Sequence, residues 1–78
     1  MKVKVYSTST CPYCKMAKMF LDEKGIAYDD LDVAGDAVAR DEMLKKSGQM
    51  GVPVIDFDGE VIIGFDQERL RGLVEKRK

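Results

Sequence analysis

Cys11-Pro12-Tyr13-Cys14 directly follows the polar segment Ser7–Thr10, which in turn follows the alternating apolar and polar residues Val3–Tyr6. This alternation predicts a β-strand, and the polar turn predicts that a helix begins near the first cysteine. The chain contains only these two cysteines. Two thiols at this spacing at a helix N-terminus are able to close a small disulfide ring and reopen it. The strand-to-helix junction is therefore the first candidate for a redox site.

The two thiols are expected to play different parts. Cys11 meets the unpaired backbone N–H groups and the positive dipole end of the helix, which favour a thiolate over a thiol. Cys14 lies one turn deeper and is shielded by the helix. We therefore expect Cys11 to attack and Cys14 to resolve. Pro12 fits the first helical turn, where its missing N–H leaves no bond unmade, and Thr10 is the expected helix cap.

Three other uses of a Cys-x-x-Cys pair fit this chain less well. A zinc site needs further cysteine or histidine ligands, and the chain has two cysteines and no histidine. A structural disulfide in a small secreted protein normally comes with more cysteines and a cleaved leader, whereas Met1–Val5 reads directly into a strand. Two inert buried thiols are disfavoured by the helix start and the flanking turn residues.

Composition limits the protein to a few classes. Its 78 residues predict one domain, 1–78, and an apolar content of 45% supports a globular fold. Charged residues make up 35% of the chain at a net charge of −1, which provides no basic surface for nucleic acid. Apolar runs such as Val61–Ile63 are too short to span a bilayer. We therefore expect a soluble cytoplasmic protein that binds neither nucleic acid nor membrane.

Periodicity and turn residues predict the order strand-helix-strand-helix-strand-strand-helix. The expected strands are Lys2–Ser7, Ile26–Val33, Val52–Phe57 and Glu60–Ile63. The expected helices are Cys11–Lys24, a second that is capped by Asp36 and runs through Lys46, and a third that is capped by Asp66. Gly25 and Gly48 are expected to end the first two helices, and Asp58-Gly59 predicts a two-residue hairpin turn.

Helical spacing also predicts which side chains face the core. The expected inward residues are Cys14, Ala17, Phe20 and Leu21, then Ala39, Met43 and Leu44, and finally Leu70, Leu73 and Val74. Phe65 is expected to pack onto Leu70 as a hydrophobic staple. Asp29, Asp30 and Asp32 are interpreted as charges that protect an exposed edge strand rather than as a metal site.

This order of elements, with Cys11-Pro12-Tyr13-Cys14 at the first strand-to-helix junction, resembles that of the glutaredoxins over nearly the whole chain. The resemblance implies an α/β thioredoxin fold, β-α-β-α-β-β-α, in which a four-stranded mixed sheet is flanked by three helices. Cys-Pro-Tyr-Cys is similar to the dithiol glutaredoxin active site at every residue. Val52-Pro53 matches the family's Val-Pro, whose proline is cis and lies beside the cysteines. Pro53 is therefore expected to support the site, and the Val52 main chain to pair with a bound thiol peptide.

The resemblance is weaker where glutaredoxins bind glutathione. Thr8 stands where many members have a lysine, while Gln49 matches a position before Val-Pro that binds the glycine carboxylate. The family's Gly-Gly pair is replaced by Ile63-Gly64. By this resemblance, the surface for glutathione or a thiol peptide comprises Tyr13, Gln49, Val52, Pro53, Gly64, Phe65 and Asp66. The missing lysine implies lower affinity for glutathione, because one charge-assisted contact is lost.

The resemblance implies a thiol-disulfide oxidoreductase. Cys11 attacks a protein disulfide or a glutathione mixed disulfide, and Cys14 then releases the reduced substrate as a Cys11–Cys14 disulfide forms. Thr10, Pro12, Tyr13 and Lys15 are expected to support the site, Lys15 by its positive potential and Tyr13 by contacting partners. No bound cofactor or metal is expected. The expected partners are disulfide-containing proteins, with glutathione or thioredoxin reductase as the reductant, and the expected state is a monomer.

Alternatives from other classes stay open. Some glutaredoxins carry an iron-sulfur cluster between two subunits with the help of glutathione, although dedicated carriers have glycine rather than proline after the first cysteine. The Gly64-Phe65 pair is similar to that of glutaredoxin-like electron donors of ribonucleotide reductase, which are reduced by thioredoxin reductase. A protein-binding module with silent thiols is a further alternative.

Overall fold

The strands and helices follow one another in the predicted order. The computed structural model describes residues 2–77, with the side chains of residues 2–76. Its elements are β1 (Val3–Ser7), α1 (Pro12–Glu23), β2 (Asp29–Asp32), α2 (Ala37–Ser47), β3 (Val54–Phe57), β4 (Glu60–Ile63) and α3 (Gln67–Arg77). Among these residues, none of the helices combines the length and apolar composition needed to cross a bilayer.

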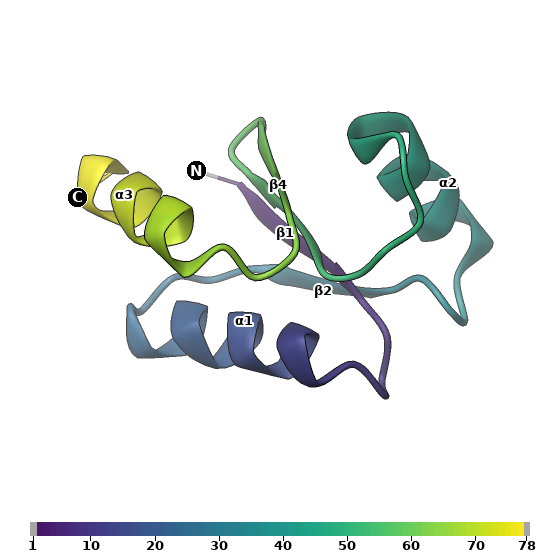
Figure 1. The fold of residues 1–78 in the computed structure, drawn as a ribbon, viewed down its shortest axis with the longest axis horizontal. Coiled ribbons are helices and arrows are strands. Elements are labelled where there is room, and N and C mark those ends of the chain that lie inside the picture. Colours follow the sequence, from purple (N-terminus) through teal and green to yellow (C-terminus); the bar gives the residue numbers. More distant parts are fainter. Residues whose placement is uncertain (1, 78) are drawn as a thin grey trace.

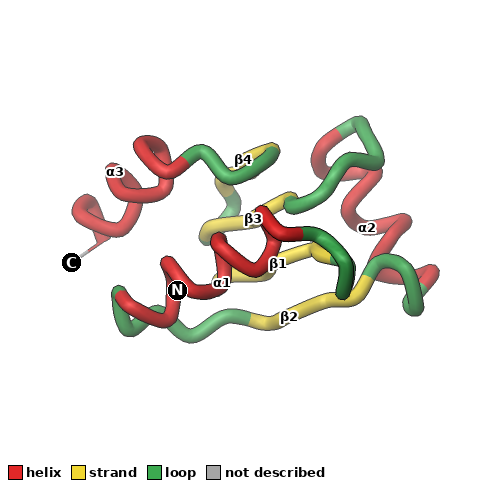
Figure 2. Tube along the Cα trace, turned by 60° about the horizontal axis from the view of Figure 1, so that its bottom comes forward, coloured by secondary structure: helices red, strands yellow, loops and turns green. Residues whose placement is uncertain are grey.

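The sheet is mixed and has four strands in the order β2-β1-β3-β4. β1 pairs in parallel with β2 and antiparallel with β3, and β3 pairs antiparallel with β4. Figure 2 shows the four strands side by side in this order. The acidic strand β2 is thus an edge strand, as its charges predict. Asp58 and Gly59 join β3 to β4 with φ angles of 52° and 96°, which are typical of the tight hairpin turn that Asp-Gly predicts.

The helices cover both faces of the sheet, with α1 and α3 on one side and α2 on the other (Figure 1). Alternation along the strands sorts the side chains between these faces, so Val3 and Val5 lie on the α1 side and Tyr6 on the α2 side. The larger core cluster contains Val3, Val5, Ala17, Phe20, Leu21, Ile55, Phe57, Ile62, Leu70, Leu73 and Val74. The smaller cluster, under α2, contains Tyr6, Val33, Ala39, Met43 and Val54.

Several predictions about the elements are wrong in detail. β2 is shorter than the predicted strand, because the Ile26 N–H bonds back to the Leu21 carbonyl at 2.9 Å in the turn that leaves α1. Leu44 is 43% exposed, so the prediction that it faces the core is wrong. Most other boundaries differ by one or two residues, within the usual fraying of element ends. Phe65 packs against the cluster that contains Leu70, in agreement with the predicted staple.

A polar cluster joins α2 to the sheet. The Tyr6 hydroxyl donates a hydrogen bond to Glu42 at 2.6 Å and accepts one from Lys46 at 2.9 Å. Lys46 also binds Asp56 at 2.6 Å, and Lys4 binds Glu42 at 2.9 Å. Within α2 only Ala39 and Met43 are buried. The helix is therefore held in place by charge-assisted hydrogen bonds as well as by apolar packing.

This cluster predicts a pH dependence of stability. The hydrogen bonds from Tyr6 and Lys4 lower the pKa of Glu42 to about 2. A carboxylate whose pKa is lowered by folding stabilises the fold above its unfolded pKa of about 4.3, and this contribution is lost as the pH falls toward the folded value. We expect Glu42→Gln to lower the free energy of unfolding at pH 7, with a difference from the unmutated protein that shrinks below about pH 4.3.

Urea denaturation of the unmutated protein and Glu42→Gln at pH 7, 5, 4 and 3 measures this difference. Glu75→Gln, which removes an exposed carboxylate from α3, is the matched control and should change the free energy of unfolding little at any of these pH values. A Glu42→Gln effect that stays constant from pH 7 to pH 3 would contradict the prediction.

Candidate active site

Cys11 occupies the N-cap of α1, at the end of the loop that leaves β1. Its backbone is extended, with φ −92° and ψ 112°, and its Sγ accepts a hydrogen bond from the Cys14 N–H at 3.2 Å. The sulfur thus occupies the place of the oxygen in a serine or aspartate cap. Thr10 is an exposed residue of the preceding turn, so the prediction that it caps the helix is wrong. The physical reason is that the extended backbone lies one residue further on, at Cys11.

The two thiols are free and differ in exposure. Cys11 is partly exposed, whereas Cys14 is completely buried on the inner face of α1. Burial raises the pKa of the Cys14 thiol to about 11, and its interaction with Cys11 adds to this rise. Cys14 is therefore a neutral thiol near pH 7, and Cys11 is the sulfur that a partner in solution can reach.

The loop before β3 lies against Cys11. The Val52 carbonyl oxygen is 3.8 Å from the Cys11 Sγ, and the Val52-Pro53 peptide bond is cis, in agreement with the resemblance. Pro53 is buried, and its carbonyl accepts a hydrogen bond from the Gly64 N–H at 2.8 Å. The structure therefore brings together segments from the first helix, the loop before β3 and the end of β4.

The open side of Cys11 is a shallow depression of about 240 Å³, lined by Ser9, Thr10, Cys11, Pro12 and Lys15. Tyr13 is 61% exposed beside it. Thr10, Pro12 and Lys15 thus lie next to the first thiol, and the Tyr13 side chain is exposed to solvent. Ser9 was not selected from the sequence, because a serine in a polar turn carries no signal of its own.

Gln49 is engaged with its own loop. Its side-chain Nε2 donates to the Gly51 carbonyl at 3.0 Å, and its Oε1 accepts a hydrogen bond from the Gly51 N–H. The Ser47 hydroxyl bonds to the Gln49 carbonyl at 2.9 Å, which joins this loop to the end of α2. The Gln49 Nε2 also donates to the Ser47 hydroxyl at 3.4 Å, so a carboxylate ligand there has to compete with a bond within the loop.

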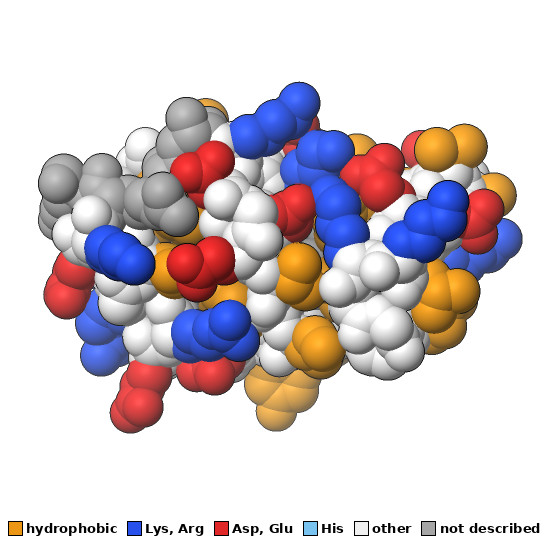
Figure 3. Space-filling model, turned by 90° about the horizontal axis from the view of Figure 1, so that it is seen from above, with side chains coloured by type: hydrophobic (Ala, Val, Ile, Leu, Met, Phe, Trp, Pro, Cys, Tyr) orange, Lys and Arg blue, Asp and Glu red, His pale blue; other side chains and the backbone are white. Residues whose placement is uncertain are grey.

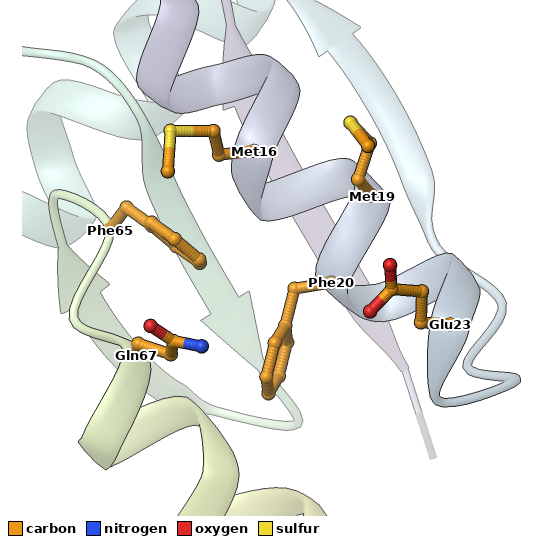
Figure 4. A pocket seen from close by; sticks show the side chains of 6 residues that line it. All are labelled: Met16, Met19, Phe20, Glu23, Phe65 and Gln67. Carbon is orange, nitrogen blue, oxygen red and sulfur yellow. The ribbon is translucent and has the colours of Figure 1, made fainter.

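The start of α3 has similar internal partners. The Asp66 carboxylate accepts a hydrogen bond from the Arg69 N–H at 3.2 Å, which confirms Asp66 as the helix cap. Phe65 packs edge to face on Phe20, with ring centroids 6.2 Å apart. Figure 4 shows Met16 and Phe20 of α1 pointing toward this end of α3, across a groove of about 200 Å³. The groove is lined by Met16, Met19, Phe20, Glu23, Phe65 and Gln67.

The sequence analysis interpreted Asp30 only as an edge-strand charge and missed its ion pair with Lys18. The Lys18 Nζ lies 2.9 Å from Asp30 Oδ2, and Asp30 Oδ1 accepts a hydrogen bond from the Ser7 hydroxyl at 3.0 Å. The available signal was spacing, since Lys18 follows Cys14 by four residues and lies one helical turn away on α1.

Charges of both signs are mixed on one face of the molecule. Lysine, arginine and acidic side chains are interspersed over the face seen in Figure 3. Within residues 2–77, no group of three or more histidine, cysteine or acidic side chains is arranged to hold a metal ion.

Comparison with known proteins agrees with this geometry. The glutaredoxin family model matches residues 3–62. A glutaredoxin-like 8.6 kDa protein in the rubredoxin operon of Clostridium pasteurianum is 47% identical over 74 residues, which cover 95% of this chain and 99% of that protein. Glutaredoxin 3 of Escherichia coli is 44% identical over 64 residues, covering 82% of this chain and 77% of that protein.

The fold also matches solved structures. The crystal structure of a thioredoxin-like protein superposes with a TM-score of 0.88 at 39% identity, and the match covers 92% of this chain and 99% of that one. The mixed sheet and its three helices thus form a thioredoxin fold. With two neighbouring thiols at the start of α1 and a family match over most of its length, the chain belongs to the glutaredoxin family and is a thiol-disulfide oxidoreductase.

Proposed function

We propose that the protein reduces protein disulfides or glutathione mixed disulfides through a dithiol-disulfide cycle of Cys11 and Cys14. The observation that carries this proposal is the asymmetry of the pair. Cys11 is partly exposed at the helix cap, while Cys14 is buried behind it with its N–H bonded to the Cys11 sulfur at 3.2 Å. One thiol is thus reachable by a substrate and the other only by Cys11.

The cycle has two exchange steps. In the first, the Cys11 thiolate attacks one sulfur of the substrate disulfide, and the other sulfur leaves with the electron pair and takes up a proton. In the second, Cys14 loses its proton and attacks the Cys11 sulfur of the mixed disulfide. The Cys11–Cys14 disulfide forms, and the remaining half of the substrate leaves as a thiol.

The proposed binding surface surrounds Cys11. The Val52 main chain pairs with the main chain of the substrate cysteine, since its carbonyl lies 3.8 Å from the Cys11 sulfur. Tyr13 contributes exposed aromatic surface, and Lys15 adds positive potential beside the first thiol. The supporting residues are Thr10, Pro12 and Pro53, and the rest of the surface is formed by Gln49, Gly64, Phe65 and Asp66.

We propose that glutathione or a thioredoxin-type reductase returns the oxidised protein to the dithiol. Glutaredoxins have reduction potentials of about −200 to −230 mV, so both glutathione and a thioredoxin-type reductase are able to reduce their disulfide. The bonds between Gln49 and Gly51 support weak glutathione binding, because a ligand carboxylate has to compete with them. The similarity to a thioredoxin-like protein at 39% identity supports the reductase as an electron source.

Two purified systems assayed in parallel test the electron source: glutathione with glutathione reductase and NADPH, and thioredoxin reductase with NADPH. We expect the oxidised protein to be turned over in at least one, as measured by NADPH consumption. Reduction by glutathione would mean that Gln49, Val52 and Asp66 suffice to bind it. Reduction only by the reductase would indicate thioredoxin-like use of a glutaredoxin frame. Reduction in neither system would contradict the proposed cycle.

We further propose that the protein acts in the cytoplasm as a monomer on disulfide-containing proteins, without a bound cofactor. Size-exclusion chromatography with light scattering and an absorption spectrum of the purified protein test this state. A colourless monomer is expected. A coloured dimer would favour the iron-sulfur carrier instead, and the chain would then not depend on a dithiol cycle.

A further inference from the structure

An ion pair is formed by Lys18, one helical turn after the buried resolving thiol on α1. Lys18 follows Cys14 by one turn of α1, so the two side chains are neighbours on one side of the helix. The Lys18 Nζ is 2.9 Å from Asp30 on β2, and Asp30 in turn accepts a hydrogen bond from the buried Ser7 hydroxyl at 3.0 Å. The pair therefore ties α1, one turn after Cys14, to the edge of the sheet, in a polar depression lined by Ser7, Thr8, Ser9, Lys18, Asp30 and Asp32.

The second exchange step needs a charge at Cys14. A thiol must lose its proton before it attacks, and burial disfavours the charged form of a group that has no partner. Burial is the largest cause of the raised pKa of Cys14. A cation near the sulfur lowers the free energy of the thiolate that this step requires.

The charged groups around Cys14 are of both signs. Cys11 raises the pKa of Cys14, whereas a hydrogen bond with the Thr8 backbone and, to a smaller extent, the charge of Lys18 lower it. Asp30 and Asp32 of β2 line the same depression as Lys18. Tyr28, before β2, and Asp22, on α1, interact with each other, and Tyr28 also interacts with Lys18. Among these neighbours Lys18 is the cation, and Asp30 holds it through their ion pair.

We propose that Lys18, held in place by Asp30, stabilises the negative charge that develops on the Cys14 sulfur when Cys14 resolves the mixed disulfide. This inference rests on the proposed dithiol cycle. The Cys14 S–H bond breaks, the Cys11–Cys14 bond forms, and the bond from Cys11 to the substrate breaks with its electron pair on the substrate sulfur, which takes up a proton. Lys18 keeps its own proton and touches no substrate, so it is a positioning residue.

The two members of the pair should act with opposite signs. Lys18→Gln removes the cation and should raise the pKa of Cys14 by about half a unit to one unit. Asp30→Asn removes the anion that offsets Lys18 and should lower it. Lys18→Arg keeps the charge and should restore the value of the unmutated protein. A merely structural ion pair predicts instead that both neutral variants loosen the site in the same way.

NMR titration of the reduced protein, with ¹³C at the cysteine Cβ, measures the pKa of Cys14 directly. The rate of the resolving step is measured by rapid mixing of the protein with dipyridyl disulfide. A rise of the Cys14 pKa by half a unit to one unit reduces the thiolate fraction by about three- to tenfold. A more basic thiolate is also a stronger nucleophile, which offsets part of this loss of rate. Lys18→Gln should therefore slow resolution by about two- to fourfold.

The first exchange step provides the internal control. In a Cys14→Ser background the attack of Cys11 on dipyridyl disulfide should proceed at the same rate with lysine or glutamine at position 18. Lys45→Gln, which removes the same charge from α2 on the other face of the sheet, should leave both the Cys14 pKa and the resolving rate unchanged.

Shifts of the Cys14 pKa in the same direction in Lys18→Gln and Asp30→Asn would overturn the inference. An unchanged Cys14 pKa in a Lys18→Gln protein that is still catalytically active would also overturn it. Failure of Lys18→Arg to restore the Cys14 pKa would also overturn it. Failure of the proposed function has a different signature, because the unmutated protein would then show no resolving step at all while the NMR titration still reports the effect of Lys18.

Discussion

Cys11→Ser should abolish thiol-disulfide exchange, with a loss of turnover on the order of a thousandfold or more. A serine hydroxyl is not ionised near neutral pH and forms no disulfide, so the first mixed disulfide cannot be made. Cys14 does not replace the lost thiol, because it is completely buried and burial raises its pKa to about 11. Reduction of a protein disulfide, followed by NADPH consumption in whichever reductant system supports turnover, measures the loss.

This loss should not result from unfolding. The Cys11 sulfur accepts the hydrogen bond from the Cys14 N–H that caps α1, and serine is among the preferred residues at this position. Cys11→Ser should therefore keep the far-UV circular dichroism spectrum and the urea midpoint of the unmutated protein. Activity retained in a folded Cys11→Ser protein would end the redox interpretation of this site.

Cys14→Ser separates the two exchange steps. Cys11 should still attack, and the mixed disulfide should accumulate until an external thiol resolves it. Reactions in which glutathione performs this resolution should be spared, whereas reduction of protein disulfides that depends on the second thiol should fail. Mass spectrometry of the trapped adduct identifies Cys11 as the modified residue. An adduct on another residue would contradict the assignment of Cys11 as the attacking thiol.

Features that depend on a few neighbouring residues were predictable from the sequence. The Asp58-Gly59 turn, the Asp36 and Asp66 caps and the glycine end of α2 were all predicted, because each follows from the backbone preferences of one or two residues. The position of the two thiols follows from the same local rules. Only the capping atom differed, since the Cys11 sulfur acts in place of the Thr10 hydroxyl.

Contacts between distant segments were not predictable from local patterns, although the resemblance placed Val52-Pro53 beside the cysteines. The Lys18–Asp30 pair requires α1 to lie over β2. The strand register, in which Val5 pairs with Asp30, does not follow from the residues of either strand alone. Gln49 was expected to be available to a ligand carboxylate, but its amide bonds to Gly51. That arrangement depends on how the loop closes, which residue identity alone does not determine.

The orientation of α2 shows the limit of helical spacing. Ala39, Met43 and Leu44 have a spacing that permits all three to face the core, yet Leu44 is exposed. The helix is turned by the bonds from its residues Glu42 and Lys46 to Tyr6 and Asp56 on the sheet. A prediction based on the spacing of apolar residues does not include these polar contacts, because they join the helix to two strands that are distant in the sequence.

The second large effect that we expect is a loss of stability on truncation of Leu21, with Leu44 as the comparison. Leu21 and Leu44 both lie inside helices, but Leu21 is completely buried in the cluster between α1, α3 and the sheet, whereas Leu44 is 43% exposed. Leu21→Ala should lower the free energy of unfolding by about 3–5 kcal/mol, because it removes buried methyl groups and leaves a cavity that the rigid sheet fills only in part. Leu44→Ala should lower it by less than about 1 kcal/mol.

The small size of the chain makes this difference decisive. For 78 residues a free energy of unfolding of about 4–12 kcal/mol is expected, so Leu21→Ala removes a large share of it while Leu44→Ala does not. Urea denaturation followed by circular dichroism measures both variants, and alanine favours the helix equally in each, so helix propensity cancels in the comparison. Equal losses in the two variants would mean that α2 also buries Leu44 in solution, and that the polar cluster of Glu42 and Lys46 does not set its orientation.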